Sequence, residues 1–250
     1  MWKIYDELIE LISEDLSVID CIVGLSWTLV RSERGIGAAM TLNGGKSAPE
    51  LNNIAGMPLK ELAGYVKSWN MTQASLGQAA INSVLNTPGN ILAITGKPLV
   101  VTRDPEEANA FTQFLPEISG KKVAVIGHFP NIEALYPICR LSIIEREPQK
   151  GDYPDAASEY ILPHQDYVFI TGTAFINKTM PRLIQLSKNA KIILVGPSAP
   201  ISPILFNYGI TAIAGLIILD EKQCWQAVQE GRKKRVFKSG GQMVCISPNP

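Results

Sequence analysis

The sequence predicts an α/β protein in which a small α+β unit precedes a larger unit built on a doubly wound parallel sheet. From Lys121 onward, short continuous apolar runs alternate with amphipathic segments. This alternation is typical of parallel strands that are covered by helices on both faces. Before residue 87 the order differs, because one helical pattern is followed by a hairpin signal and then by two more helical patterns. A chain of 250 residues is long enough for two such units.

The first unit is predicted to span residues 1–86. Its opening segment carries apolar residues at helical spacing, namely Ile4, Leu8, Leu11 and Ile12. Pro58 is expected in the first turn of a later helix, where a missing amide hydrogen is tolerated. The predicted elements are a helix over 2–14, strands over 17–32 and 35–42 joined by the polar turn "SERG", and helices over 58–69 and 74–86.

Residues 87–120 are predicted to connect the two units. Within them, "DPEEANAFTQFL" predicts a helix capped by Asp104, with Pro105 at its first position. The second unit is predicted to cover residues 121–250. Its expected strands are 123–127, 141–145, 166–171, 191–196 and 210–219, with helices that begin near Asn131, Asp155, Thr179, Ser202 and Glu221.

Composition argues against several classes of partner. Lys and Arg together number 23, as do Asp and Glu, so the overall charge favours neither nucleic acid nor an anionic membrane. The one sharp basic cluster, residues 232–235, is interpreted as a solvated helix end. The N-terminal segment is acidic and amphipathic, which is unlike a secretion signal. Four scattered cysteines without a CxxC pair predict a reduced, cytoplasmic protein.

The turn "GHFP" after the first strand of the second unit is where a dinucleotide fold carries "GxGxxG". Phe129 and Ile132 stand at two of the glycine positions and would obstruct a pyrophosphate, so ordinary NAD binding is not expected. Glu145 ends the next strand, where a ribose-binding acid would sit, although a solvated strand-end acid is an equal interpretation. The "GGKS" at 44–47 lacks the upstream glycine and the following helix of an ATPase loop.

Two other loops follow strands at the same predicted edge of the sheet, where ligands of such folds bind. In "TGTAFINKT", small residues and the polar groups of Thr171, Thr173 and Asn177 suit a ligand, whereas Thr179 is predicted to cap a helix. In "GPSAPISP", Gly196 and Ser198 are candidate pocket residues, and the serine before Pro203 is predicted to be a cap.

His128 occupies the most favourable site position of the two histidines, since His164 is predicted at the opposite, surface end of a strand. The sequence offers no set of four nitrogen and sulfur ligands for a structural zinc ion. A divalent metal, if one binds, would use His128 with carboxylates such as Glu145. The absence of a "GxSxG" elbow leaves hydrolytic catalysis without a candidate nucleophile.

Several ordered motifs resemble one protein family. "VAVIGHFP", "DYVFITGTAFINKTMPRLIQL" and "VGPSAPISPILFNYGITAIAG" resemble the Rossmann-like domain of the bacterial and archaeal family named for heavy-metal chelation. "GLSWTLV" and "ASLGQAAINSVLN" resemble the enolase N-terminal-like domain that precedes it. The resemblance covers nearly the whole chain. It implies a small α+β enolase N-terminal-like domain followed by a Rossmann-like parallel-sheet domain, with a site in the cleft between the two.

The same resemblance, mapped motif by motif, gives a set of candidate cleft residues. His128 and Glu145 are the candidates for proton transfer or metal ligation. Asn82 is expected to face the cleft from the first unit, with a capping or exposed role as the alternatives. The remaining candidates for ligand binding are Gly127, Phe129, Thr171, Gly172, Thr173, Asn177, Gly196, Pro197 and Ser198.

Three functional hypotheses follow. The first is a protein, with or without turnover, that binds a small molecule or metal complex in the interdomain cleft and handles heavy metals. The second is an enzyme that uses an adenosine nucleotide or S-adenosylmethionine, with Glu145 on the ribose. The third is a non-catalytic module that senses a metabolite. The expected partner is a small molecule or metal chelate, without nucleic acid or membrane, and a homodimer stays open.

Overall fold

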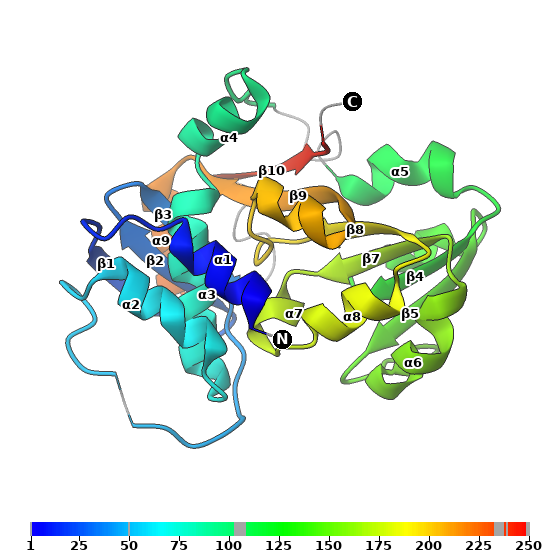
Figure 1. The fold of residues 1–250 in the computed structure, drawn as a ribbon, viewed down its shortest axis with the longest axis horizontal. Coiled ribbons are helices and arrows are strands. Elements are labelled where there is room, and N and C mark those ends of the chain that lie inside the picture. The colour runs from blue at the N-terminus through cyan, green and yellow to red at the C-terminus, as the bar shows by residue number, and fades with distance from the viewer. Residues whose placement is uncertain (1, 50, 103–108, 233–237, 239, 249–250) are drawn as a thin grey trace.

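The structure, a computed structural model, describes residues 2–49, 51–102, 109–232, 238 and 240–248 and contains two β-sheets (Figure 1). The smaller sheet has the order β1-β2-β3, and its strands are antiparallel. The larger sheet has seven strands in the order β10-β9-β8-β7-β4-β5-β6. An α+β unit followed by a mostly parallel sheet is the predicted fold class, which is confirmed.

The first unit packs its helices against the small sheet. Its strands are β1 (Val18–Val23), β2 (Trp27–Ser32) and β3 (Gly35–Met40). Its helices are α1 (Lys3–Glu10), α2 (Leu59–Gly64), the 3-10 helix η1 (Tyr65–Lys67) and α3 (Met71–Leu85). The central helix, α3, lies directly on β3, because a Cβ atom on Gly37 would fall 2.1 Å from the carbonyl oxygen of Ala79.

Two predictions for this unit are wrong in detail. The segment 17–32 forms two antiparallel strands rather than one, because the chain reverses between Val23 and Trp27. Gly24 in this reversal lies close to α9 (Glu221–Gln229), because a Cβ atom there would lie 2.7 Å from Cγ1 of Val228 and 3.0 Å from the carbonyl oxygen of Trp27. The first helix ends at Glu10 instead of residue 14. Its apolar spacing continues past the end because Ile12, which is buried, enters the core from the turn that follows.

The larger sheet contains the five predicted strands and two others. The predicted ones are β4 (Lys122–Ile126), β5 (Arg140–Glu145), β7 (Tyr167–Thr171), β8 (Lys191–Val195) and β9 (Ile210–Ile218), and they are parallel. The short strand β6 (Tyr153–Pro154) extends one edge. At the other edge β10 (Gly241–Ile246) pairs antiparallel with β9, an edge strand that the repeated pattern of strand and helix did not predict.

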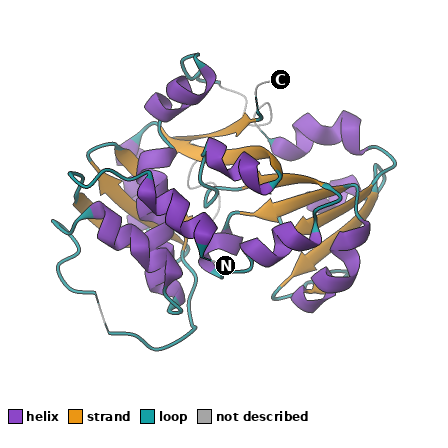
Figure 2. Cartoon of the chain, in the orientation of Figure 1, coloured by secondary structure: helices purple, strands orange, loops and turns teal. Residues whose placement is uncertain are grey.

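Alternate residues of the central strands enter different apolar clusters, as expected for a sheet covered on both faces. Val123 and Val125 belong to one cluster, whereas Ala124 between them belongs to the other. In β7, Phe169 likewise faces away from Val168 and Ile170. Helices lie on both sides of this sheet (Figure 2).

The helical segments of the second unit are short. The predicted starts correspond to the 3-10 helices η2 (Ile132–Leu135), η3 (Asp155–Ala157) and η5 (Pro203–Tyr208) and to the α-helices α8 (Met180–Leu186) and α9 (Glu221–Gln229). Additional short helices are α6 (Ser158–Ile161), η4 (Leu162–His164) and α7 (Thr173–Ile176). The crossover between β4 and β5 is too short for a long helix, because β5 begins soon after β4 ends.

The connecting segment contains α4 (Pro88–Thr95) and α5 (Ala110–Ile118). The predicted cap Asp104 and the neighbouring Pro105 lie outside the described residues, as does most of the basic cluster at 232–235. Helix α5 begins at Ala110, and the side chain of Asn109 accepts a hydrogen bond from the amide of Phe111. None of the described helices has the length and apolarity that crossing a bilayer requires.

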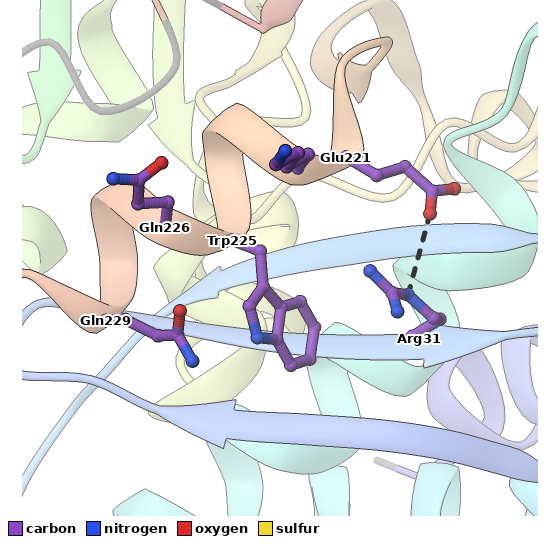
Figure 3. Close-up of a pocket in the computed structure, with 6 residues that line it drawn as sticks. Arg31, Glu221, Trp225, Gln226 and Gln229 are labelled. Carbon is purple, nitrogen blue, oxygen red and sulfur yellow. Dashed lines mark ion pairs between the residues drawn. The ribbon is translucent and has the colours of Figure 1, made fainter.

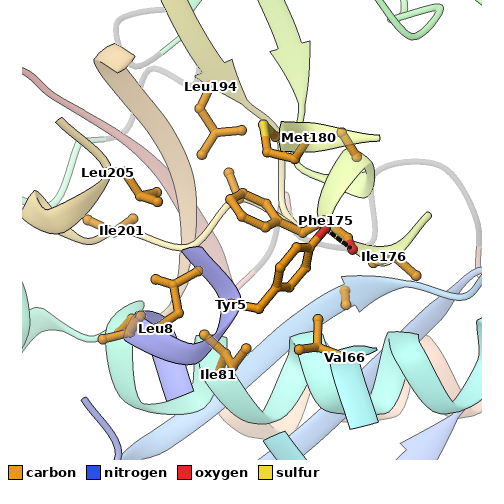
Figure 4. Close-up of a cluster of buried hydrophobic side chains, with 14 of the residues drawn as sticks. Tyr5, Leu8, Val66, Ile81, Phe175, Ile176, Met180, Leu194, Ile201 and Leu205 are labelled. Carbon is orange, nitrogen blue, oxygen red and sulfur yellow. Dashed lines mark hydrogen bonds between the residues drawn. The ribbon is translucent and has the colours of Figure 1, made fainter. Parts of the chain in front are cut away.

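The two units share a continuous apolar core. Tyr5 and Leu8 of α1 pack with Phe175 of α7 and Leu205 of η5 in one cluster (Figure 4). The buried hydroxyl of Tyr5 donates to the carbonyl of Phe175 at 3.2 Å. Burial and hydrogen bonds therefore hold the first unit against the carboxyl-end loops of β7 and β8.

Candidate functional site

The carboxyl ends of β8, β7, β4 and β5 lie side by side, which brings the predicted loops to one edge of the sheet. Gly127 follows β4 and Gly196 follows β8, with φ of +103° and +106°. Most side chains are disfavoured at such angles, so glycine is what allows both strands to turn sharply here. Parallel strands and these two turns therefore place the predicted loops along one edge of the sheet.

His128 is the most strongly held polar residue of this edge. Its Nδ1 lies 2.9 Å from Oδ2 of Asp152, and its Nε2 lies 3.0 Å from Oε1 of Glu133. The side chains of His128 and Asp152 are 14% and 1% exposed, whereas that of Glu133 is 56% exposed. The imidazole is thus fixed on its buried side by one carboxylate and approached on its open side by another.

The pKa of His128 is raised above its ordinary value. Burial by itself would lower this pKa, but the hydrogen bond and the charge of Asp152 act in the opposite direction. Glu133 adds a smaller effect of the same sign. A protonated imidazole donates to both carboxylates, so His128 is suited to carry a proton.

Glu145, the other predicted catalytic residue, meets His128 through the backbone. Oε2 of Glu145 accepts from the amide of His128 at 2.9 Å, and Oε1 accepts from the amide of Arg146 at 2.6 Å. One carboxylate oxygen therefore holds the turn after β4, and the other binds the residue that follows β5. This arrangement makes Glu145 a supporting residue for the loop that carries His128.

Phe129 lies over the ends of β4, β7 and β8. A Cβ atom on Gly127 would meet the Phe129 ring at 3.4 Å and Cβ of Thr171 at 3.3 Å, and one on Gly196 would meet the same ring at 3.7 Å. The ring also packs edge-on against Phe111 of α5, with the centroids 5.3 Å apart. The aromatic ring thus occupies the place where a dinucleotide loop would leave room for a pyrophosphate.

The "TGT" loop pairs its own hydroxyls. The hydroxyls of Thr171 and Thr173 share a hydrogen bond at 3.0 Å, and both residues are half-buried. Asn177 is used locally, because its Oδ1 accepts from the amide of Thr179 at 3.1 Å and from its hydroxyl at 2.6 Å. Thr179 occupies the predicted N-cap position of α8, but its hydroxyl donates to Asn177 and makes no capping bond.

The loop after β8 joins the two units. The hydroxyl of Ser198, which is buried, accepts from the amide of Met40 at the end of β3 at 2.9 Å. Gly172 allows the two loops to touch, because a Cβ atom there would lie 2.2 Å from the nitrogen of Ala199. Pro197 is half-buried beside them. Ser202 occupies the predicted N-cap position of η5, but its buried hydroxyl makes no capping bond.

Asn82 lies apart from the other predicted residues. It is fully buried in α3, its amide donates to the carbonyl of Ala38 at 2.8 Å, and its Oδ1 accepts from Gln78 at 3.1 Å. Asn82 is therefore neither an exposed residue nor a helix cap, which were the two other roles considered for it from the sequence. The structure therefore brings together the residues of the "GHFP", "TGT" and "GPS" loops and uses Asn82 to attach α3 to β3.

Lys178 is a polar residue of this region that the sequence analysis overlooked. It is 8% exposed, and its φ of +66° is unusual for a residue with a side chain. Its Nζ donates to the carbonyl oxygens of Ser68 and Ile176 and lies 5.8 Å from the ring centroid of Trp69. The signal in the sequence was a lysine inside an otherwise small and neutral loop at the carboxyl end of a strand.

Burial lowers the pKa of Lys178 to about 8. Because the pKa of Lys178 is depressed in the folded state, the charged amine opposes folding at neutral pH. This destabilisation disappears as the pH rises from about 8 toward the pKa that the lysine has in the unfolded chain. We expect the stability of the wild type, relative to Lys178→Met, to rise by about 2 kcal/mol between pH 7.5 and 9.5. Urea denaturation at several pH values measures this difference. Cysteines and tyrosines titrate in both proteins, so they cancel.

The exposed Lys188 provides the matched control for that experiment. Lys188→Met should give a stability curve parallel to that of the wild type across the same pH range. A parallel curve for Lys178→Met would contradict the expectation.

The described side chains do not form a chelating set. Within those parts of the chain, no three His, Cys, Asp or Glu side chains are placed to share a metal ion. Asp152 and Glu133 contact opposite nitrogens of His128, so the three groups do not converge on one point. Cys139 and Cys224 are buried, and burial raises the pKa of both thiols, which disfavours the thiolate that soft metals prefer.

Comparisons with known proteins agree with this fold. Residues 109–247 match the domain family DUF364, and residues 5–85 match DUF4213, each with the description "Putative heavy-metal chelation". An uncharacterized protein of Methanocaldococcus jannaschii is 31% identical over 93% of this chain and 91% of its own length.

Two crystal structures are similar over nearly the whole chain. A protein of unknown function from the DUF364 family of Desulfitobacterium hafniense is 40% identical, with a TM-score of 0.90 and coverage of 99% of this chain and 98% of its own. Another from Pyrococcus horikoshii is 25% identical, with a TM-score of 0.79 and 98% coverage of each chain. The chain therefore belongs to the DUF364 family of proteins, described as "Putative heavy-metal chelation".

Proposed function

We propose that this protein binds a small anionic molecule, or a metal ion already held by such a molecule, at the carboxyl edge of the seven-stranded sheet. The ligand would lie between the loops of residues 121–250 and the first unit, residues 1–86. The observation that carries the proposal is His128, whose imidazole is held by a buried carboxylate on one side and met only by an exposed one on the other.

The open side of His128 suits an anion. Glu133 is 56% exposed and belongs to the short helix η2, so its side chain can turn into solvent when a ligand oxygen arrives. Nε2–H would then donate to the ligand, while Asp152 keeps the ring in place through Nδ1. If turnover occurs, the same Nε2 is the group that would give or take a proton.

The surrounding loops favour a compact ligand. Gly127 and Gly196 present backbone without side chains, and the hydroxyls of Thr171 and Thr173 lie beside them. Phe129 fills the place of a pyrophosphate, which argues against a dinucleotide. Glu145 already accepts two backbone hydrogen bonds, so the adenosine hypothesis gains no support from it.

A metal would arrive in complex with its own ligands. Chelation of a bare ion needs several convergent donors, which the described side chains do not supply. Recognition of a metal complex needs only hydrogen bonds and charge complementary to the chelating molecule. His128, with its raised pKa, and the hydroxyls of Thr171 and Thr173 at the same edge of the sheet would donate to the carboxylates of an organic chelator.

The two histidines allow a direct test by NMR of the imidazole nitrogens. We expect citrate to shift the signals of His128, and the paramagnetic nickel–citrate complex to broaden them, while those of the exposed His164 stay unchanged. Because the pKa of His128 is raised, binding should persist to a higher pH than an ordinary imidazole would allow and weaken as the pH rises through that pKa.

Affinity measured by calorimetry gives the second readout. His128→Asn should weaken citrate binding by about tenfold or more, the usual loss for a hydrogen bond to a charged group. His164→Asn is the matched control and should bind as the wild type does. No response of His128 to citrate, phosphate or nickel–citrate would contradict the proposal, as would bare nickel binding more tightly than its citrate complex.

A further inference from the structure

A surface cavity of about 420 Å³ lies between β2 of the small sheet and α9 of the second unit (Figure 3). It is remote in sequence from the loops that carry His128 and the "TGT" motif. Its lining consists of Arg31 from β2 together with Glu221, Lys222, Trp225, Gln226 and Gln229 from α9. The volume falls within the range of small-molecule sites.

Arg31 is incompletely satisfied at this position. Its Nε has no hydrogen-bond partner, and Oε2 of Glu221 is 3.5 Å away. That nitrogen has no accessible surface, whereas the side chain as a whole is 31% exposed, so a ligand in the cavity would meet the rest of the guanidinium group. A hydrogen bond between two charged groups is usually shorter, near 2.8 Å, so Glu221 balances charge without binding the donor well. A buried donor without a partner destabilises the folded protein unless something supplies an acceptor. Figure 3 shows the other guanidinium nitrogens turned toward the Trp225 side of the cavity.

Trp225 provides a flat apolar wall beside that cation. The Arg31 guanidinium carbon lies 4.8 Å from the ring centroid, which orients the arginine against the indole. Gln229 lies on the other side of the indole in Figure 3 and offers an amide that can donate or accept. The cavity thus combines a cation, an aromatic ring and a planar polar group.

The charge of the lining favours an anion. Arg31 and Lys222 contribute two positive charges and Glu221 one negative charge, which leaves one net positive charge. A rigid base supports them, because Leu29 and Ile36 of the small sheet pack with Cys224, Ala227 and Val228 of α9 in one buried cluster. The cavity is therefore fixed by packing between the two units.

We propose that this cavity is a second ligand site, specific for a small oxyanion attached to a flat ring. The oxyanion, a carboxylate or a phosphate, would accept hydrogen bonds from Arg31, and the ring would lie against Trp225. The inference stands on the cavity, the orphaned Nε and the indole, and it does not depend on the function proposed for His128.

The test uses the full chain and amide and indole NMR spectra. Benzoate and phenyl phosphate are expected to shift the indole signal of Trp225, assigned by its loss in Trp225→Phe, and the Nε–H signal of Arg31. If only benzoate shifts these signals, the site binds carboxylates. If only phenyl phosphate shifts them, the site binds phosphates, and if both do, it binds oxyanions in general. Benzylammonium, with the ring but the opposite charge, should leave both signals unchanged.

Variants distinguish binding in this cavity from binding elsewhere on the protein. Arg31→Met should weaken binding of the aromatic anions by about tenfold or more, whereas Arg34→Met, an exposed arginine of the same hairpin, should not. Lys222→Met removes the second positive charge of the lining from an exposed side chain and should weaken binding several-fold. His128→Asn should bind both anions normally, which distinguishes this site from the first. Equal affinities of wild type and Arg31→Met, or no shift at Trp225 with either anion, would overturn the proposal.

Discussion

Replacement of Asn86 by alanine is expected to lower the free energy of unfolding by about 4 kcal/mol, since each buried polar group left without a partner costs about 1–3 kcal/mol. Asn86, which ends α3, is 2% exposed. Its Nδ2 donates to the carbonyls of Ala199 at 2.9 Å and Leu216 at 3.0 Å, and its Oδ1 accepts from the amide of Ile201 at 2.9 Å. One side chain thus satisfies three backbone groups of the second unit.

Urea denaturation followed by circular dichroism measures this loss. The exposed Asn207 is the matched control, and Asn207→Ala should change stability by less than about 0.5 kcal/mol, as surface substitutions usually do. Because the three bonds cross between the units, Asn86→Ala should also make unfolding less cooperative. A loss below about 1 kcal/mol, far less than unsatisfied backbone groups imply, would show that water or local rearrangement satisfies them.

The second large effect is expected for Gly172→Ala, which should destabilise the protein by about 3 kcal/mol, the upper end of the usual cost of overpacking. The added Cβ atom would lie 2.2 Å from the nitrogen of Ala199 and 2.5 Å from the carbonyl carbon of Ser198. Backbone atoms cannot turn aside as a flexible side chain can. The loop after β8 must therefore move, and the bond from Met40 to Ser198 should lengthen or break.

Thermal unfolding and amide hydrogen exchange at Met40 test both parts of this expectation. Gly89→Ala is the control, because that glycine lies in the first turn of α4 with no atom within 4 Å of an added Cβ. The control should be neutral or slightly stabilising, since alanine favours helices by up to about 1 kcal/mol over glycine. Unchanged exchange at Met40 in Gly172→Ala would contradict the expected movement of the loop.

The strands of the larger sheet were predictable because their apolar runs are a local property of the chain. Residues 123–125 and 167–170 are buried on both faces, which leaves a continuous apolar signal. The reversal at Gly24 was not predictable in the same way. Gly24 packs closely against Val228, a residue that comes from the other end of the chain, and no local pattern records that contact.

In the candidate site, too, some features were predictable from the sequence and others were not. The position of His128 at the end of a strand followed from the order of strands and turns. Its partner Asp152 was not predicted, because the loop that carries it returns to the imidazole only in the folded chain. Asn82 and Ser198 were predicted as ligand-binding residues from their motifs, yet their polar groups meet Ala38 and Met40 instead.

The sequence by itself determined which segments form strands and that one unit precedes another, because periodicity and apolar runs depend only on neighbours along the chain. The tertiary structure decided which polar groups meet. Lys178 contacts Ser68, and Arg31 stacks on Trp225, across separations that no local pattern records. A buried donor takes whichever acceptor packing brings to it, so the partners that give a site its chemistry are a property of the fold.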